Sequence, residues 1–249
     1  MRTRISCCIA VLVLCFSNAS SATTVTIGMG NYEPYYIADG ETGIFTDLLA
    51  AVFRHLPGHE PKFLFGRPNK RLWQEFKQGR IDGVANLPSN EDLGGCVTDP
   101  VFQFHDVAIT KVEADLAIES VSDLAGLRVV AFQGAKEFLG DEYSKFTNFK
   151  EYTEIAQQEL QSSMLFGGRA DVSVGDMFLF LYSLKSIEHW KVAPADFKFH
   201  PIFPKLTTSM GFMEVGMCSQ FNDALKKVRQ SGEYDEIYRS YLDKLGYQN

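Results

Sequence analysis

Two short stretches decide the fold: Gly79-Arg80-Ile81-Asp82-Gly83-Val84 and Gly168-Arg169-Ala170-Asp171-Val172-Ser173. In both, a Gly-Arg-x-Asp segment stands between an apolar helical pattern and the start of a strand pattern. So short a repeat can arise by chance. The evidence for a true repeat is that both copies occur at the same place in the order of elements. We interpret the repeat as the mark of two related α/β lobes.

The elements around each copy alternate between strand and helix, which favours a mostly parallel sheet in each lobe. Around the first copy we predict strands over 24–27, 62–65 and 81–85 and helices over 44–53 and 69–78. Around the second we predict strands over 127–132 and 170–174 and helices over 155–166 and 176–186. Segment 219–245 has the spacing of two amphipathic helices that break at Ser231-Gly232.

Ligands of open α/β sheets collect outside the carboxyl ends of the strands. In this sequence those ends fall at 28–34, 86–90, 132–136 and 175–176. If the two lobes face each other, these loops line one cleft, an arrangement typical of a binding protein.

Composition excludes several classes of protein. The chain has 249 residues, of which 45% are hydrophobic and 22% charged, so it can build a core and is not disordered throughout. The formal net charge is −7 and there is no run of Lys or Arg. Binding to nucleic acid or to an anionic membrane needs clustered positive charge, so we expect neither partner.

Residues 1–22 have the pattern of a secretory signal peptide. Arg2 and Arg4 precede the uncharged apolar run 9–16, and small residues follow at 20–22. A membrane anchor is the alternative, but the apolar run is far shorter than the roughly 20 residues that a spanning helix needs. We therefore expect a soluble protein exported to the periplasm, and we expect it to act as a monomer.

The exported chain keeps two cysteines, Cys96 and Cys218, in a compartment that permits disulfides. A single bridge and two separate buried thiols are both consistent with the sequence.

Motifs for catalysis, metals or cofactors are absent from the sequence. No Gly-x-Ser-x-Gly, His-Glu-x-x-His, Cys-x-x-Cys or Walker-type run occurs. Gly28-Met-Gly30 follows a strand, but Glu33 stands where a phosphate loop has its third glycine. His55 and His59 have a metal-ligand spacing, but Pro57 lies between them and no third ligand is near. We expect no metal, no cofactor and no catalytic residue.

Several motifs, in order along the mature chain, resemble the family-3 periplasmic solute-binding proteins of ABC importers. This family has the type II periplasmic binding fold and includes the binders of polar and basic amino acids. The matching segments are 24–28, Tyr32-Glu33-Pro34-Tyr35, 43–48, 71–82, Thr98-Asp99-Pro100, 122–126 with Gln133-Gly134, and 231–238.

The resemblance implies two α/β lobes joined by hinge strands near 104–108 and 202–209. Lobe 1 is then 23–104 with 209–249, and lobe 2 is 105–208. Both cysteines fall in lobe 1, which removes one objection to a disulfide between them.

The resemblance also implies binding residues. Tyr32 corresponds to the aromatic residue that covers the ligand side chain, and Asn69, Asn86 and Ser89 correspond to polar residues of the lobe 1 pocket. Asp176 corresponds to the carboxylate that holds an amino acid's ammonium, although a residue at this place can instead cap the following helix.

At two places the sequence differs from the family pattern for binding an amino acid's carboxylate. The family's amino-acid binders carry an arginine for the ligand's carboxylate, whereas this chain has Asn90-Glu91-Asp92 and no arginine in that loop. Ala135 stands where the family has a threonine beside that carboxylate-binding arginine. Lys136 lies near a helix start and is a candidate substitute cation; an ordinary solvated lysine, or one that neutralises Asp176, is the alternative.

The function that the resemblance implies is capture of a small polar ligand, an amino acid or related amine, for an ABC importer. A ligand-sensing module for a membrane receptor is one alternative. An exported enzyme similar to cyclohexadienyl dehydratase is another, but that enzyme resembles relatives that keep the arginine turn. A protein that has lost small-ligand binding and acts through its surface is the last.

Overall fold

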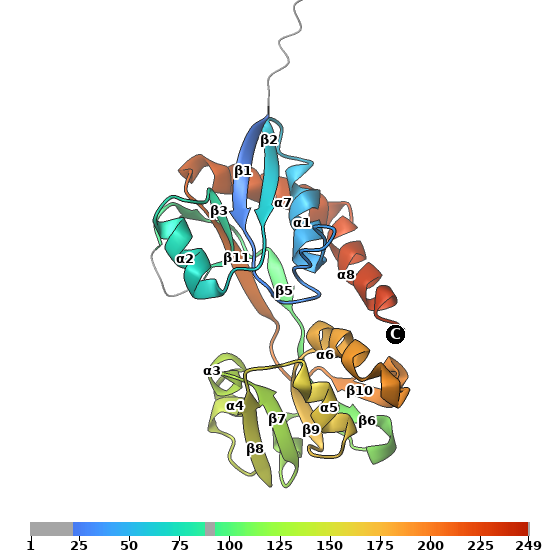
Figure 1. Ribbon diagram of the computed structural model, residues 1–249. Coiled ribbons are helices and arrows are strands. Elements are labelled where there is room, and N and C mark those ends of the chain that lie inside the picture. Colours follow the sequence, from blue (N-terminus) through green and yellow to red (C-terminus); the bar gives the residue numbers. More distant parts are fainter. Residues whose placement is uncertain (1–21, 88–92, 249) are drawn as a thin grey trace, which may run out of the picture.

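The computed structural model describes residues 22–87 and 93–248, which form two lobes, one above the other in Figure 1. Residues 1–21 of the predicted signal peptide 1–22, together with Ser89 and Asn90-Glu91-Asp92, lie outside the described residues. Lobe 1 contains β1 (Thr23–Gly28), α1 (Ile44–Phe53), β2 (His59–Leu64), α2 (Asn69–Lys77), β3 (Gly83–Leu87), β4 (Cys96–Val97), β5 (Phe102–Phe104), β11 (Leu206–Phe212), α7 (Val215–Gln230) and α8 (Glu233–Lys244).

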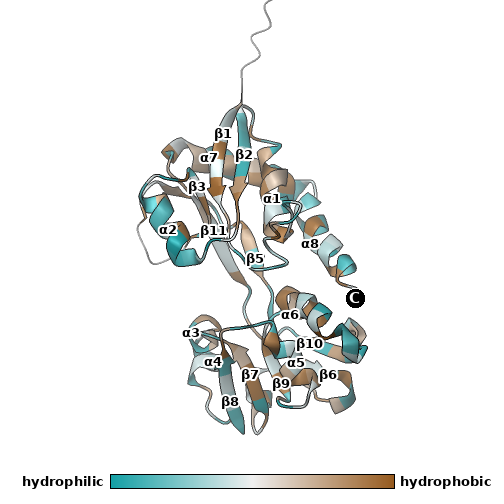
Figure 2. Cartoon of the chain, in the orientation of Figure 1, coloured by the Kyte–Doolittle hydropathy of each residue, from teal (hydrophilic) through white to brown (hydrophobic). Residues whose placement is uncertain are grey.

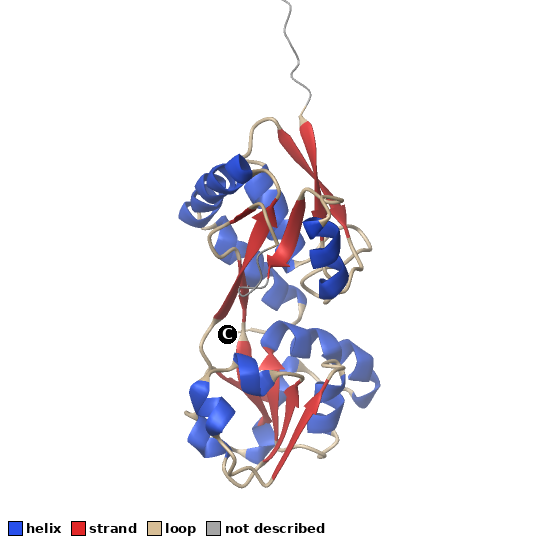
Figure 3. Ribbon diagram, turned by 90° about the vertical axis from the view of Figure 1, so that its left-hand side faces the viewer, coloured by secondary structure: helices blue, strands red, loops and turns tan. Residues whose placement is uncertain are grey.

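Lobe 2 is built from the middle of the chain. It contains β6 (Asp106–Lys111), β7 (Arg128–Phe132), α3 (Ala135–Phe138), α4 (Asp141–Lys145), β8 (Glu151–Ile155), α5 (Leu160–Phe166), β9 (Val172–Asp176), α6 (Met177–Ser183) and β10 (Phe197–His200). Short 3-10 helices lie at Val112–Ala114, Val121–Leu124, Leu184–Trp190 and Pro194–Asp196. The chain enters lobe 2 through His105 and leaves it through 201–205, and Figure 3 shows these crossings from the side.

The two sheets have the same plan. Sheet 1 runs β2-β1-β3-β11-β4, with β5 also paired to β11, and sheet 2 runs β10-β6-β9-β7-β8. The three strands β2-β1-β3 are parallel, as are β8-β7-β9, and each set continues into an antiparallel strand that crosses from the other lobe. The α/β class predicted from the sequence is confirmed, and the crossing strands make both sheets mixed.

The repeated Gly-Arg-x-Asp segment makes the same bonds in both lobes. In lobe 1, Asp82 Oδ2 accepts a hydrogen bond from the N–H of Thr26 at 2.8 Å. In lobe 2, Asp171 Oδ2 accepts one from the N–H of Arg128, also at 2.8 Å. Each aspartate therefore ties the beginning of one parallel strand to its neighbour, so the repeat has a structural role.

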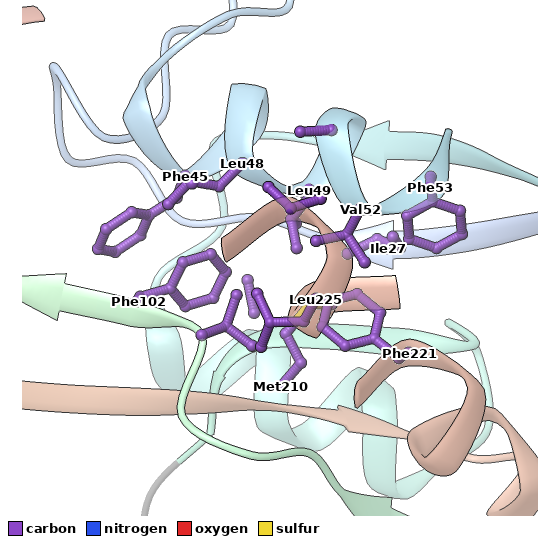
Figure 4. Close-up of a cluster of buried hydrophobic side chains, with 14 of the residues drawn as sticks. Ile27, Phe45, Leu48, Leu49, Val52, Phe53, Phe102, Met210, Phe221 and Leu225 are labelled. Carbon is purple, nitrogen blue, oxygen red and sulfur yellow. The ribbon is translucent and has the colours of Figure 1, made fainter. Parts of the chain in front are cut away.

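The main core of lobe 1 lies between its sheet and the helices α1, α7 and α8. Figure 4 shows the part of this core to which α1 and α7 contribute. Helix α1 spans the predicted residues because its apolar stripe, including Leu48, Leu49 and Val52, is fully buried. It begins after Gly43, whose φ is +124°, and a Cβ there would lie 2.5 Å from the carbonyl oxygen of Tyr35. A side chain at this position is therefore excluded.

Apolar residues also line both faces of the lobe 2 sheet. In β6, Ala108 packs into the cluster that contains Tyr143, whereas Val107 and Ile109 pack into the cluster under α5 and α6. In Figure 2, strand β7 of this sheet is brown, whereas the edge strand β8 is largely teal.

Sequence reasoning was wrong about segment 151–166. A helix over 155–166 was predicted, but Ile155 ends strand β8 and the helix α5 begins only at Leu160. β8 is the edge strand of sheet 2, and its half-exposed pattern Glu-Tyr-Thr-Glu-Ile carries no apolar run.

Cys96 in β4 and Cys218 in α7 form a disulfide, with their Cα atoms 6.0 Å apart. The bond ties the edge strand of sheet 1 to the helix that covers it.

Candidate functional site: the junction and pocket between the lobes

Asp176 is the centre of the junction between the lobes. It ends β9, caps α6, and is 3% exposed. Its Oδ1 accepts the N–H groups of Phe178 at 2.9 Å and Leu179 at 3.0 Å. Its Oδ2 accepts the hydroxyl of Tyr35 at 2.7 Å and the N–H of His105 at 2.8 Å. Four donors from both lobes and the hinge therefore hold this buried carboxylate.

The first turn of α6 is inserted into lobe 1. The ring of Phe178 is 1% exposed and belongs to the lobe 1 core cluster. Its centroid lies 6.0 Å from that of Tyr35, 5.3 Å from that of His105 and 5.8 Å from that of Tyr238. Burial, followed by the charge of Asp176, raises the pKa of Tyr35 well above its usual value, so its hydroxyl stays a donor.

A second buried carboxyl lies beside Asp176. Asp106 begins β6, pairs with Asp176 across the β6–β9 ladder, and is 8% exposed. Desolvation and then the charge of Asp176 raise its pKa to about 8, so it is mainly protonated at neutral pH. The four donors all bond to Asp176, whereas Asp106 carries a proton at the same junction.

Both lobes line one pocket of about 320 Å³, which we call the interlobe pocket. Its lining residues are Asn31, Tyr32 and Glu33 from lobe 1 and Ala156, Gln158, Glu159, Leu179, Tyr182 and Ser183 from lobe 2. The hydroxyl of Tyr182 donates to Glu33 Oε2 at 2.6 Å, and this bond raises the pKa of Tyr182 to about 12. Another pocket, of about 380 Å³, lies against α7 and is lined by lobe 1 alone.

The predicted binding residues do not all lie at the interlobe pocket. Tyr32 lines the interlobe pocket and is 42% exposed. Asn69 begins α2 and Asn86 lies in β3, and neither lines this pocket. Asn86 has φ +62°, and its carbonyl accepts the indole N–H of Trp73 at 3.1 Å. Asp176 is placed at the junction, where it acts as the helix cap that was considered as its alternative role.

Lys136 is partly buried and bonds within lobe 2. Its Nζ donates to the carbonyl of Tyr143 at 2.9 Å and to the carbonyls of Ser144 and Phe146. Aromatic rings surround it, those of Tyr143, Phe149 and Tyr152, with centroids 4.9–5.3 Å away. Burial lowers its pKa although Glu154 opposes that shift. The ammonium therefore holds the α3–α4 segment together and does not face the interlobe pocket.

The turn before α3 has its own internal acceptor. Glu154 accepts the N–H of Gly134 at 2.9 Å, the N–H of Lys136 at 3.3 Å and the hydroxyl of Tyr152 at 2.7 Å. Burial opposes ionisation of Glu154, but these donors outweigh it and lower its pKa. The N–H groups of Gly134 and Lys136 are thus bonded to the carboxylate of Glu154 and are not open to a ligand anion.

Sequence reasoning missed Glu33, Glu159 and Tyr182 in the pocket and Tyr35 and Asp106 at the junction. Asp106 had a signal, since an acidic residue directly before the apolar run Val107-Ala108-Ile109 is unusual in a buried strand. Glu33 and Tyr182 had none, because their contact joins residues far apart in the sequence.

Within 22–87 and 93–248, no group of three or more His, Cys, Asp or Glu residues could hold a metal ion. In the same part of the chain, no helix combines the length and the apolar character needed to cross a bilayer.

Solved structures share the two-lobed fold over nearly the whole chain. A probable amino-acid ABC transporter extracellular-binding protein, ytmK from Bacillus subtilis, is 19% identical with a TM-score of 0.69, covering 89% of this chain and 98% of that one. The chain has the two-lobed fold of the periplasmic binding proteins. A histidine kinase sensor domain with similarity to periplasmic binding proteins is 17% identical, with a TM-score of 0.62 and coverage of 90% and 97%. The GluR0 ligand-binding core in complex with L-glutamate is 15% identical, with a TM-score of 0.67 and coverage of 89% and 99%.

No protein-family model and no curated protein matches the sequence. The fold that the motifs implied is confirmed by the solved structures, at identities that speak to the fold alone.

Proposed function

We propose that this chain is a solute-binding protein that captures a small polar ligand, an amino acid or a related amine, and delivers it to an ABC importer. The observation that carries the proposal is the interlobe pocket, because residues of both lobes line it. A ligand held there contacts both lobes at once and favours the conformation in which they are close. Binding and release are sufficient for this role, and no chemical step is part of it.

We further propose that the protein is exported by the signal peptide 1–22 and works in the periplasm as a monomer. An ABC importer's membrane subunits are then its partner. The lobes are joined by two chain crossings, at His105 and at 201–205, which suit a hinge between open and closed forms.

A ligand-sensing role is the second candidate, because the histidine kinase sensor domain and the GluR0 core have the same fold over nearly their whole length. In that case the partner is a membrane receptor. Affinity capture of the ligand-loaded protein from detergent-solubilised membranes distinguishes the two roles by recovering importer subunits or a receptor.

Thermal unfolding across a panel of amino acids, amines, small carboxylates and sugars tests the proposal. A ligand at 100 times its dissociation constant adds about 2.7 kcal/mol, which raises the midpoint by roughly 5–10 °C for a chain of this size. Absence of any shift contradicts ligand capture. Turnover of prephenate or arogenate by the purified protein contradicts a binding role without chemistry.

A further inference from the structure

All charged residues that line the interlobe pocket are acidic. Its charged lining residues are Glu33 from lobe 1 and Glu159 from lobe 2. Across the described residues, neither carboxylate is part of an ion pair. A concave site lined by one sign of charge attracts and concentrates the opposite sign.

Two aromatic rings complete this environment. The ring of Tyr32 is 42% exposed at the pocket. One face of the Tyr182 ring is already occupied, since Lys185 Nζ lies 4.2 Å from its centroid, although Lys185 is not among the lining residues. Tyrosine faces attract ammonium and guanidinium groups, and Asn31 and Gln158 add amide oxygens that accept N–H donors.

The turn before α3 and the side chain of Lys136, the lobe 2 groups considered for a ligand's carboxylate, bond within the protein. The N–H groups of Gly134 and Lys136 donate to Glu154. The ammonium of Lys136 donates to three backbone carbonyls. The pocket therefore offers acceptors and the exposed ring of Tyr32 to a cation, and no described basic side chain lines it to hold an anion.

We propose that the interlobe pocket selects an organic cation, a protonated amine or guanidinium, and requires no carboxylate on that ligand. This inference rests on the proposed function and names the ligand class of the same site. The cation donates to Glu159 of lobe 2 and to Glu33 of lobe 1, whose Oε1 remains available while Oε2 accepts Tyr182. Because the two carboxylates come from opposite lobes, the ligand's charge draws the lobes together.

The test is isothermal titration of the purified protein with matched probes. Agmatine is compared with arginine and cadaverine with lysine, because each pair differs by the α-carboxylate, and glutamine serves as a neutral zwitterion. The variants are Glu33→Gln and Glu159→Gln, which keep the side-chain shape. Glu119→Gln is the control, since Glu119 is exposed and does not line the pocket.

We expect agmatine or cadaverine to bind at least as tightly as its amino-acid counterpart. Each pocket variant should weaken that binding about tenfold or more, the usual scale for one charge-assisted hydrogen bond, while Glu119→Gln leaves it within about twofold. The affinity should also fall with added salt, because both carboxylates are exposed.

Two results overturn the inference but leave the proposed function standing: arginine or lysine binding at least tenfold tighter than its decarboxylated partner, or glutamine binding that the pocket variants do not change. Failure of all five probes to bind overturns the inference as well, and binding of another class in the thermal panel would then preserve the proposed function. If no ligand binds in either the titration or the thermal panel, both the inference and the proposed function are contradicted.

Discussion

The hydroxyl of Tyr35 in lobe 1 donates to the carboxylate of Asp176 in lobe 2 across 2.7 Å. Tyr35 is fully buried and Asp176 almost so, and the N–H of His105 in the hinge donates to the same oxygen. Both lobes and the hinge therefore meet at one carboxylate. A hydrogen bond to a buried charge is stronger than one between neutral groups, so this contact fixes how α6 sits against lobe 1.

Tyr35→Phe should lower the free energy of unfolding by about 1.5–3 kcal/mol, because it removes one donor to a buried carboxylate while keeping the ring. Tyr36→Phe is the matched control: the Tyr36 hydroxyl is buried and has no hydrogen-bond partner within the described part of the chain. It should be neutral or stabilise by up to about 1 kcal/mol. Urea denaturation of the three proteins measures both effects, and equal losses for the two variants would refute this assignment.

Asp106→Asn should make the protein more stable at neutral and alkaline pH. The pKa of Asp106 is about 8 in the folded protein and its ordinary value is 3.8, so the folded state binds the extra proton between these values. Stability therefore falls as pH rises through this window, by up to about 1.4 kcal/mol per pH unit. Asparagine is neutral at every pH and removes that slope.

Urea denaturation at pH 5, 7 and 9 measures the difference between Asp106→Asn and the wild type. Burial lowers the pKa of His105, which contributes a slope of the opposite sign, but this contribution cancels largely in the difference. The gap should widen as pH rises, whereas Asp39→Asn at an exposed site should follow the wild type. Parallel profiles for Asp106→Asn and the wild type would exclude a raised pKa.

Lys136→Ala should reduce stability by about 2–3 kcal/mol, because it leaves carbonyls without their donor and removes a cation from an aromatic enclosure. Its effect on agmatine affinity should stay within about twofold, since the lysine does not line the interlobe pocket. Lys145→Ala, which removes an exposed i,i+4 ion pair with Asp141, should change stability by less than about 0.5 kcal/mol. A specific loss of binding at unchanged stability would instead support Lys136 as a ligand residue.

Much of the fold could be predicted because the signals are local. The stripe of α1 and the break between α7 and α8 at Ser231-Gly232 are visible in the sequence and are confirmed. The repeated Gly-Arg-x-Asp predicted two similar lobes, and Asp82 and Asp171 do make equivalent bonds. The strand β8 was missed because an edge strand with half-exposed faces needs no apolar run.

The site was harder to predict because its contacts are not local. Tyr35 and Asp176 are 141 positions apart, and Glu33 and Tyr182 are 149 apart. Resemblance suggested that Lys136 might face a ligand, but the convergence of three carbonyls on its ammonium depends on how the α3–α4 segment folds. Of the predicted binding residues that the structure describes, only Tyr32 lines the interlobe pocket.

Replacing both Cys96 and Cys218 by serine should lower the free energy of unfolding by about 3–5 kcal/mol, because the bond closes a loop across a sequence separation of 122 and restricts the unfolded chain. The double variant is used so that no free thiol remains. Guanidinium denaturation of the wild type with a reductant provides the control and should give the same midpoint as the variant without it. A variant as stable as the oxidised wild type would show that β4 and α7 hold together without the bond. Agmatine affinity should stay unchanged in the variant, since both cysteines lie in lobe 1 and neither lines the interlobe pocket.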